Sequence, residues 1–76
     1  MSPEEIGSAV RTARRGMGLR QNQLAGAAGV GLRFIVDLEA GKPTAQIGKT
    51  LRVLDTLGCK LRIELPPLPG AVERAQ

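Results

Sequence analysis

The sequence predicts a mainly α-helical domain of four to five short helices, followed by one β-strand near its C-terminal end. Three observations lead to this fold class. Apolar residues recur at helical spacing in four segments between residues 3 and 57, and a glycine follows each segment. From residue 59 to residue 65, apolar and charged residues alternate strictly, which is typical of a half-buried strand. The chain has 76 residues, so we expect a single domain with a small core.

The first helix is predicted to begin at Pro3. Ser2 is a natural N-cap, and Glu5 stands three residues after it, which makes a capping box. Gly16 and Gly18 are expected to end the helix. An apolar stripe at helical spacing would face the core, and it consists of Ile6, Ala9, Val10, Ala13 and Met17.

The second helix is predicted over residues 21–28, and Gly29 is expected to end it in a left-handed conformation. Gly26 within this helix costs about 1 kcal/mol relative to alanine. The small side chains allow close contact with a neighbouring helix. The inner face consists of Leu24, Ala25 and Ala28.

The third helix is predicted over residues 32–40, with Ile35 and Leu38 facing inward and Gly41 as its stop. It follows the second helix after a tight turn that contains glycine, which makes a helix-turn-helix. In such a unit the second of the two helices can enter the major groove of DNA. This stretch therefore predicts a function as well as a fold.

A fourth helix is predicted to begin after Thr44, a candidate N-cap, and to end at Leu57 with Gly58 as its stop. Its apolar residues again follow helical spacing. The predicted inner stripe consists of Ile47, Leu51, Leu54 and Leu57.

The strand at residues 59–65 is predicted to pair across a homodimer, because a lone strand exposes unpaired backbone groups that invite association. Two-fold symmetry makes such pairing antiparallel. The alternative is an extended segment that lies against its own helices. The predicted organisation is a DNA-binding domain at 1–58, this dimerisation strand and a flexible tail at 66–76. The side chains expected at the dimer interface are Cys59, Leu61, Ile63 and Leu65, while Lys60, Arg62 and Glu64 would face solvent.

The composition favours an anionic partner and argues against an enzyme. The formal net charge is +4, which suits nucleic acid or an acidic protein surface. Histidine is absent and Cys59 is the lone cysteine, so we expect no catalytic nucleophile–base pair, no common zinc site and no cofactor. Neither a membrane-length apolar run nor a signal peptide is present, so a cytoplasmic protein without a membrane partner is expected.

Residues 6–58 resemble the Cro/cI-type helix-turn-helix of phage repressors, also called xenobiotic-response-element-like. The resemblance lies in residues 18–25, in Gly29-Val30, and in the later positions Ile35, Leu38, Glu39 and Gly41. It implies a fold of the lambda-repressor type. Residues 33–35, 37–44 and 51–54, together with the terminal strand, resemble the HipB-like antitoxins. That resemblance implies a dimeric autorepressor that binds and neutralises a HipA-like kinase toxin.

The resemblance also implies roles for individual residues. Gln21 would bind a phosphate and orient the recognition helix. Base readers would be Gly31, Leu32, Arg33 and Val36, with Asp37 as a further candidate. Arg33 is the one strong donor among them and could bind guanine in bidentate fashion, whereas Leu32 or Val36 could touch a thymine methyl. Lys42 would contact a backbone phosphate.

Arg14 and Glu39 match a pair that forms an internal salt bridge in phage repressors, so structural roles are expected for both. Phe34 is expected to be a core residue, the alternative being a position at the edge of the DNA. Arg20 and Gly31 depart from the family pattern, which usually has a side-chain N-cap at each position. Arg11, Arg15 and Arg20 are phosphate candidates only.

The sequence thus predicts a homodimeric repressor of a palindromic operator in double-stranded DNA, with an antitoxin role and a HipA-like kinase toxin as partner. Two alternatives remain open at this point. One is a protein-interaction module whose helices bind only another protein, and the other is a stand-alone repressor without a toxin.

Overall fold

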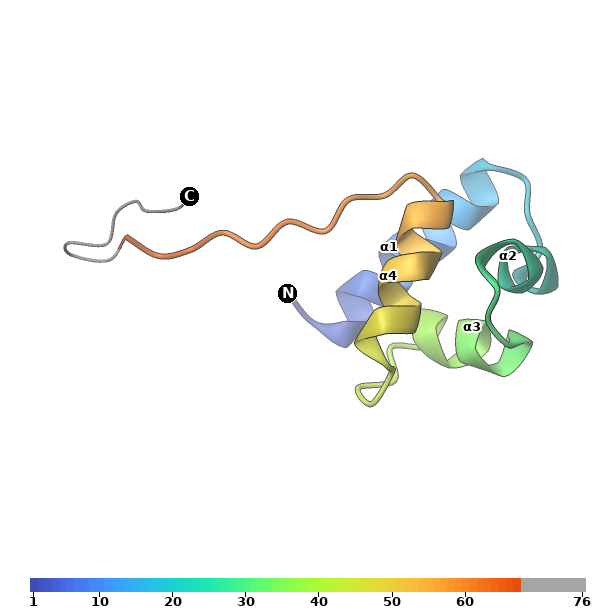
Figure 1. The fold of residues 1–76 in the computed structure, drawn as a ribbon, viewed down its shortest axis with the longest axis horizontal. Coiled ribbons are helices and arrows are strands. Elements are labelled where there is room, and N and C mark those ends of the chain that lie inside the picture. Colours follow the sequence, from blue (N-terminus) through green and yellow to red (C-terminus); the bar gives the residue numbers. More distant parts are fainter. Residues whose placement is uncertain (68–76) are drawn as a thin grey trace.

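The computed structural model describes residues 1–67, which form four helices followed by an extended segment (Figure 1). Helix α3 packs against both α1 and α2, and α4 packs against α2. The expected mainly helical fold is confirmed, with these four helices between residues 1 and 67. Their bounds are Pro3–Gly16 for α1, Gln21–Ala28 for α2, Leu32–Glu39 for α3 and Ile47–Thr56 for α4.

The core takes one fully buried side chain from each helix. These side chains are Val10 of α1, Leu24 of α2, Ile35 of α3 and Val53 of α4, and all are 0% exposed. Burying a side chain of this size stabilises the fold by roughly 1.5–3 kcal/mol. The core therefore depends on all four helices together and would be incomplete if any one of them were missing.

Helix α1 begins with the predicted capping box. The Glu5 N–H donates to Ser2 Oγ at 3.1 Å, and the Ser2 N–H donates to Glu5 Oε1 at 2.8 Å. Gly7, five residues after Ser2, lies against the end of α3. A Cβ atom at this position would stand 2.4 Å from the carbonyl oxygen of Leu38. Only glycine therefore permits α1 and α3 to cross at this distance.

The turn between α2 and α3 also follows the prediction. Gly29 is left-handed, with φ of 70°, and the Val30 N–H donates to the Ala25 carbonyl at 3.0 Å. The inner face of α2 is buried at the three predicted positions. The helix-turn-helix expected over this stretch is therefore present.

Helix α4 differs from the prediction in its start and in its buried face. It begins at Ile47 with Gln46 as N-cap, so the assignment of Thr44 as N-cap was wrong. Ile47 and Leu51 are 64% and 43% exposed, whereas Thr50 is buried. The Thr50 hydroxyl donates to the Gln46 carbonyl at 2.9 Å. Because this bond satisfies the hydroxyl within the helix, a polar residue can occupy the buried face.

The stripe predicted for α1 was also partly wrong. Ala9 and Met17 are exposed, whereas Val10 is buried and Ile6 packs partly buried against the core. Arg14 occupies the buried position one turn beyond Val10. Its burial depends on an ion pair that is described below.

Residues 59–65 are extended, and no strand occurs in residues 1–67 (Figure 1). A strand needs a partner backbone, and a single chain offers none here. Cys59 and Leu61 pack half-buried against the core, whereas Ile63 and Leu65 are 77% and 79% exposed. The alternative of a segment lying on its own helices thus holds only for its first residues. Of the predicted tail at 66–76, residues 68–76 lie outside the described part of the chain.

Candidate nucleic-acid interface

The exposed face of α3 carries the predicted base readers. Leu32 is 48% exposed and the side chain of Arg33 is 84% exposed, whereas Val36 is half-buried. Gly31 is the exposed N-cap and provides no side-chain cap. These four residues therefore lie on the first two turns of one helix, which is the part of a recognition helix that contacts base edges.

Asp37 joins two of the predicted DNA-binding cations. Its Oδ1 lies 3.3 Å from Arg33 Nε, and its Oδ2 lies 3.4 Å from Lys42 Nζ. Both cations are more than half exposed, so each pair is worth about 1 kcal/mol or less. Asp37 therefore adds little to the stability of the fold. The i,i+4 spacing of Arg33 and Asp37 is the sequence signal for this contact.

Glu39, at the end of α3, is fully buried beneath the candidate interface. Arg14 of α1 donates to both of its carboxylate oxygens, from Nε at 2.6 Å and from Nη2 at 3.0 Å. A third Arg14 nitrogen, Nη1, donates to the Leu19 carbonyl at 2.8 Å. The internal salt bridge that the resemblance implied is confirmed, and it ties α1 to α3.

Gln21 and Arg11 complete the contacts of Glu39. The Gln21 amide donates to Glu39 Oε1 at 3.1 Å, and Arg11 Nε lies 3.4 Å from the same oxygen. Gln21 is the first residue of α2, so this bond fixes the start of α2 against the end of α3. The amide nitrogen has a second hydrogen, which could reach a phosphate at this helix N-terminus.

The pKa values of the central pair follow from these contacts. Burial alone would raise the pKa of Glu39, but the hydrogen bonds from Arg14, Gln21 and Arg11 and the charge of Arg14 together outweigh it and lower this pKa. The hydrogen bond to Glu39 raises the pKa of Arg14. Both groups are therefore charged at neutral pH, and the carboxylate stays ionised despite its burial.

The start of α2 lacks a side-chain cap from Arg20, as the departure from the family pattern led us to expect. Gln23 provides a partial substitute, because its Oε1 accepts from the Arg20 N–H at 2.8 Å. Phe34, expected in the core, is half-buried and packs against it, with Lys49 Nζ 5.8 Å from the ring centroid. The Lys49 contact was not foreseen.

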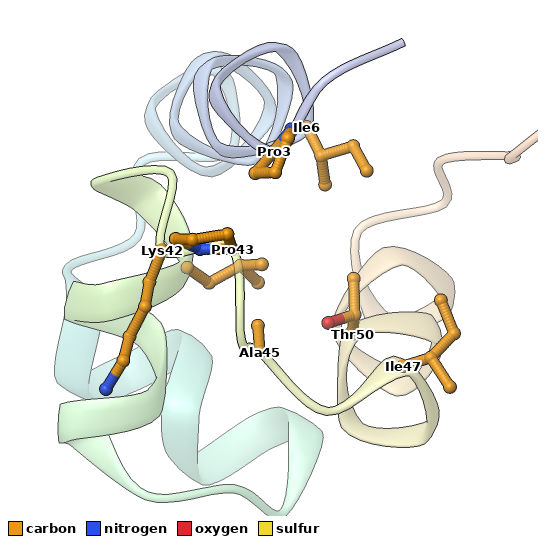
Figure 2. A pocket seen from close by; sticks show the side chains of 8 residues that line it. Pro3, Ile6, Lys42, Pro43, Ala45, Ile47 and Thr50 are labelled. Atoms are coloured by element: carbon orange, nitrogen blue, oxygen red, sulfur yellow. The ribbon is translucent and has the colours of Figure 1, made fainter.

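A small cavity of about 100 Å³ lies between the start of α1, the loop that joins α3 to α4, and the start of α4. Figure 2 shows Pro3 and Ile6 of α1 facing Pro43 and Ala45 of the loop across it, while the Lys42 ammonium lies away from them. The lining is mainly apolar, with Lys42 and Thr50 as its polar residues, and the Thr50 hydroxyl already donates to the Gln46 carbonyl at 2.9 Å. Within residues 1–67, no group of three or more His, Cys, Asp or Glu side chains could hold a metal ion, and no helix is long and apolar enough to cross a membrane.

Comparisons with known proteins show similarity to a curated relative and to a solved structure. No protein-family model matches the chain. An uncharacterized HTH-type transcriptional regulator, y4mF, of Sinorhizobium fredii (strain NBRC 101917 / NGR234) is 66% identical over 65 residues, which cover 86% of each protein. A solved chain named MDT Protein has a TM-score of 0.77 at 19% identity, covering 88% of this chain and 94% of that one. At this identity the structural likeness shows the fold alone.

Proposed function

Because the chain belongs to the family of HTH-type transcriptional regulators, which are not enzymes, we propose that it is a homodimeric repressor that binds a palindromic operator. The observation that carries this proposal is the exposed face of α3. There the side chain of Arg33 is 84% exposed, and Asp37 contacts both Arg33 and Lys42.

The proposal gives each residue of this face a task. Arg33 reads a guanine through O6 and N7, and Leu32 or Val36 contacts a thymine methyl. Gln21 and Lys42 bind phosphates and fix the register of α3 on the duplex. Gly31 lets the backbone approach the DNA but offers no side chain to read it. Direct readout thus rests on few contacts, and the remaining specificity comes from DNA shape.

Dimerisation through residues 59–65 would give the protein the two-fold symmetry that a palindromic operator requires. Two copies of α3 related by a two-fold axis would read half-sites about one helical turn apart. The exposure of Ile63 and Leu65, at 77% and 79%, supports pairing with a second copy because these side chains have no cover within residues 1–67.

The antitoxin role is the most specific part of the proposal. It rests on the resemblance of residues 33–35, 37–44 and 51–54, together with the predicted terminal strand, to HipB-like antitoxins. The proposed partner is a HipA-like kinase toxin. A kinase-like gene immediately downstream, whose product co-purifies with this chain, would support the role. Operator binding without such a neighbour would instead indicate a stand-alone repressor.

The test is a gel shift with the DNA upstream of the gene, together with light scattering. We expect a dimer at micromolar concentration, one specific complex that survives competitor DNA, and an affinity that falls steeply with salt through counterion release. A monomer would contradict the dimer. A folded protein without a specific complex would contradict DNA recognition and favour the protein-interaction module.

A further inference from the structure

Arg11 is an exposed arginine of α1 that is anchored to a buried group. Its Nε donates to Oε1 of the buried Glu39 at 3.4 Å, while 48% of its side chain remains exposed. Arg15, one turn further along the same helix, is exposed and makes no ion pair within residues 1–67. A side chain that is already held in place loses less conformational entropy when it binds a ligand. Of these two candidates for a phosphate contact, Arg11 is therefore the better prepared.

The charges around Glu39 leave Arg11 able to bind an anion. Arg14 binds both carboxylate oxygens of Glu39 and is only 10% exposed, so its charge neutralises the carboxylate. Arg11 contacts the same carboxylate through Nε alone, at the longer distance of 3.4 Å. Its Nη1 and Nη2 atoms make no hydrogen bond within residues 1–67. The group of three side chains therefore carries one positive charge in excess, on an exposed guanidinium whose outer N–H groups remain available.

Gln21 of α2 lies beside Arg11, because both side chains bind the same oxygen. Gln21 Nε2 donates to Oε1 of Glu39 at 3.1 Å. A carboxylate only accepts hydrogen bonds, so this contact holds the amide with its NH2 group, rather than its carbonyl oxygen, toward Glu39. The second amide hydrogen of Gln21 and the outer N–H groups of Arg11 are thus donors on neighbouring side chains. Two such donors can bind two oxygens of one phosphate.

We propose that Arg11 and Gln21 together bind a single phosphate of the operator, and that Glu39 is the positioning residue that holds both donors. A backbone phosphate of DNA fits this pair because its single negative charge matches the one charge in excess and its two free oxygens match the two donors. The inference rests on the proposed binding of DNA. It adds a contact from α1 to an interface that was built from α2, α3 and Lys42.

The salt dependence of binding to the upstream DNA tests the Arg11 contact. Each lost phosphate contact lowers the slope of log affinity against log salt concentration by about 0.9. In a dimer, the affinity advantage of the native protein over Arg11→Ala should therefore shrink roughly tenfold between about 50 mM and about 200 mM salt. The matched control is Arg15→Ala, which removes the same charge from an exposed position of the same helix. Its effect should change by roughly threefold or less, because a charge without a contact is screened.

Neutral methylphosphonate linkages, placed at one position of the bound DNA at a time, identify the phosphate. One position per half-site should weaken binding of the native protein but have much less effect on Arg11→Ala, which has already lost that contact. Gln21→Ala should lose its sensitivity at the same position. A merely structural role of Arg11 would not single out one phosphate. Arg14 keeps both of its bonds to Glu39 in Arg11→Ala, so the urea midpoint of that variant should stay close to the native value.

The failures of this inference and of the proposed function are distinguishable. Specific DNA binding with a native salt slope in Arg11→Ala, or an equal loss in Arg15→Ala, would overturn the inference alone. Sensitivity lost at different phosphates in Arg11→Ala and Gln21→Ala would overturn the shared phosphate. A folded native protein that forms no specific complex with DNA would overturn the proposed function, and the inference with it.

Discussion

Replacing Glu39 with glutamine should cost about 3–5 kcal/mol of the free energy of unfolding, because it leaves a buried guanidinium without its carboxylate. The side chain of Glu39 is 0% exposed and that of Arg14 is 10% exposed. Water therefore cannot replace the lost contact. A domain of this length has a total stability of roughly 4–11 kcal/mol, so the loss is a large part of the whole.

Urea denaturation followed by circular dichroism measures this loss near neutral pH. The matched control is Asp55→Asn, which removes the same charge from an exposed residue of α4 that has no ion pair within residues 1–67. Its effect should stay within about 0.5 kcal/mol. If Glu39→Gln lost less than about 1 kcal/mol relative to this control, the assignment of the buried pair as a structural element would be refuted.

The pH dependence gives a second measure of the same pair. The folded state lowers the pKa of Glu39 below its ordinary value of 4.5, so the unfolded chain takes up this proton first as the pH falls. The stabilisation by Glu39 is therefore complete above about pH 4.5 and is lost as the pH falls through the folded pKa. The difference in the free energy of unfolding between the native protein and Glu39→Gln should narrow only below about pH 4.5. A gap that narrows at higher pH would show a raised pKa and contradict the geometry.

The remaining predictions concern two glycines and the two exposed cations. Gly7→Ala should lower the free energy of unfolding by about 1–3 kcal/mol, because the new Cβ would stand 2.4 Å from the Leu38 carbonyl oxygen. Gly26→Ala, on the open side of α2, should instead raise it by about 0.5–1 kcal/mol in the same urea measurement. Arg33→Ala should relax base preference at one position per half-site by about 1–3 kcal/mol in competition gel shifts. Arg33→Lys keeps the charge and should lose the same preference; a uniform loss across sequences would contradict base reading. Lys42→Ala should weaken binding to all DNA sequences alike, and it should lower the slope of log affinity against log salt concentration by about one per subunit. A sequence-dependent loss of affinity would contradict a phosphate contact.

Local signals in the sequence were enough to predict the helix-turn-helix. The bounds of α2 and the left-handed Gly29 follow from apolar spacing and from a glycine stop, both of which act within one turn. The capping box at Ser2 is likewise a property of four consecutive residues. For these two elements the determining interaction is short-range, and the sequence and the structure agree.

Most of the failures involve interactions between segments, although the N-cap of α4, wrongly assigned to Thr44, is a local feature. Apolar spacing predicted Leu51 on the buried face of α4, whereas the structure buries Thr50, whose hydroxyl bonds within the helix. Periodicity could not place Arg14 in the core, because its burial depends on Glu39, 25 residues further along the chain. The close crossing at Gly7 depends equally on the position of α3, and nothing in the neighbouring residues of α1 indicates it.

The shared carboxylate of Asp37 has a consequence for how such a protein would search a genome. Arg33 and Lys42 are each paired with Asp37 in the free protein, so part of their charge is neutralised before they meet DNA. A phosphate of non-cognate DNA must displace Asp37 from these cations, so its net gain in binding free energy is small. A guanine edge offers Arg33 two directed bonds that a phosphate of random sequence does not. In the proposed repressor, Asp37 would compete with non-cognate phosphates for both cations and so increase the difference in affinity between the operator and other DNA.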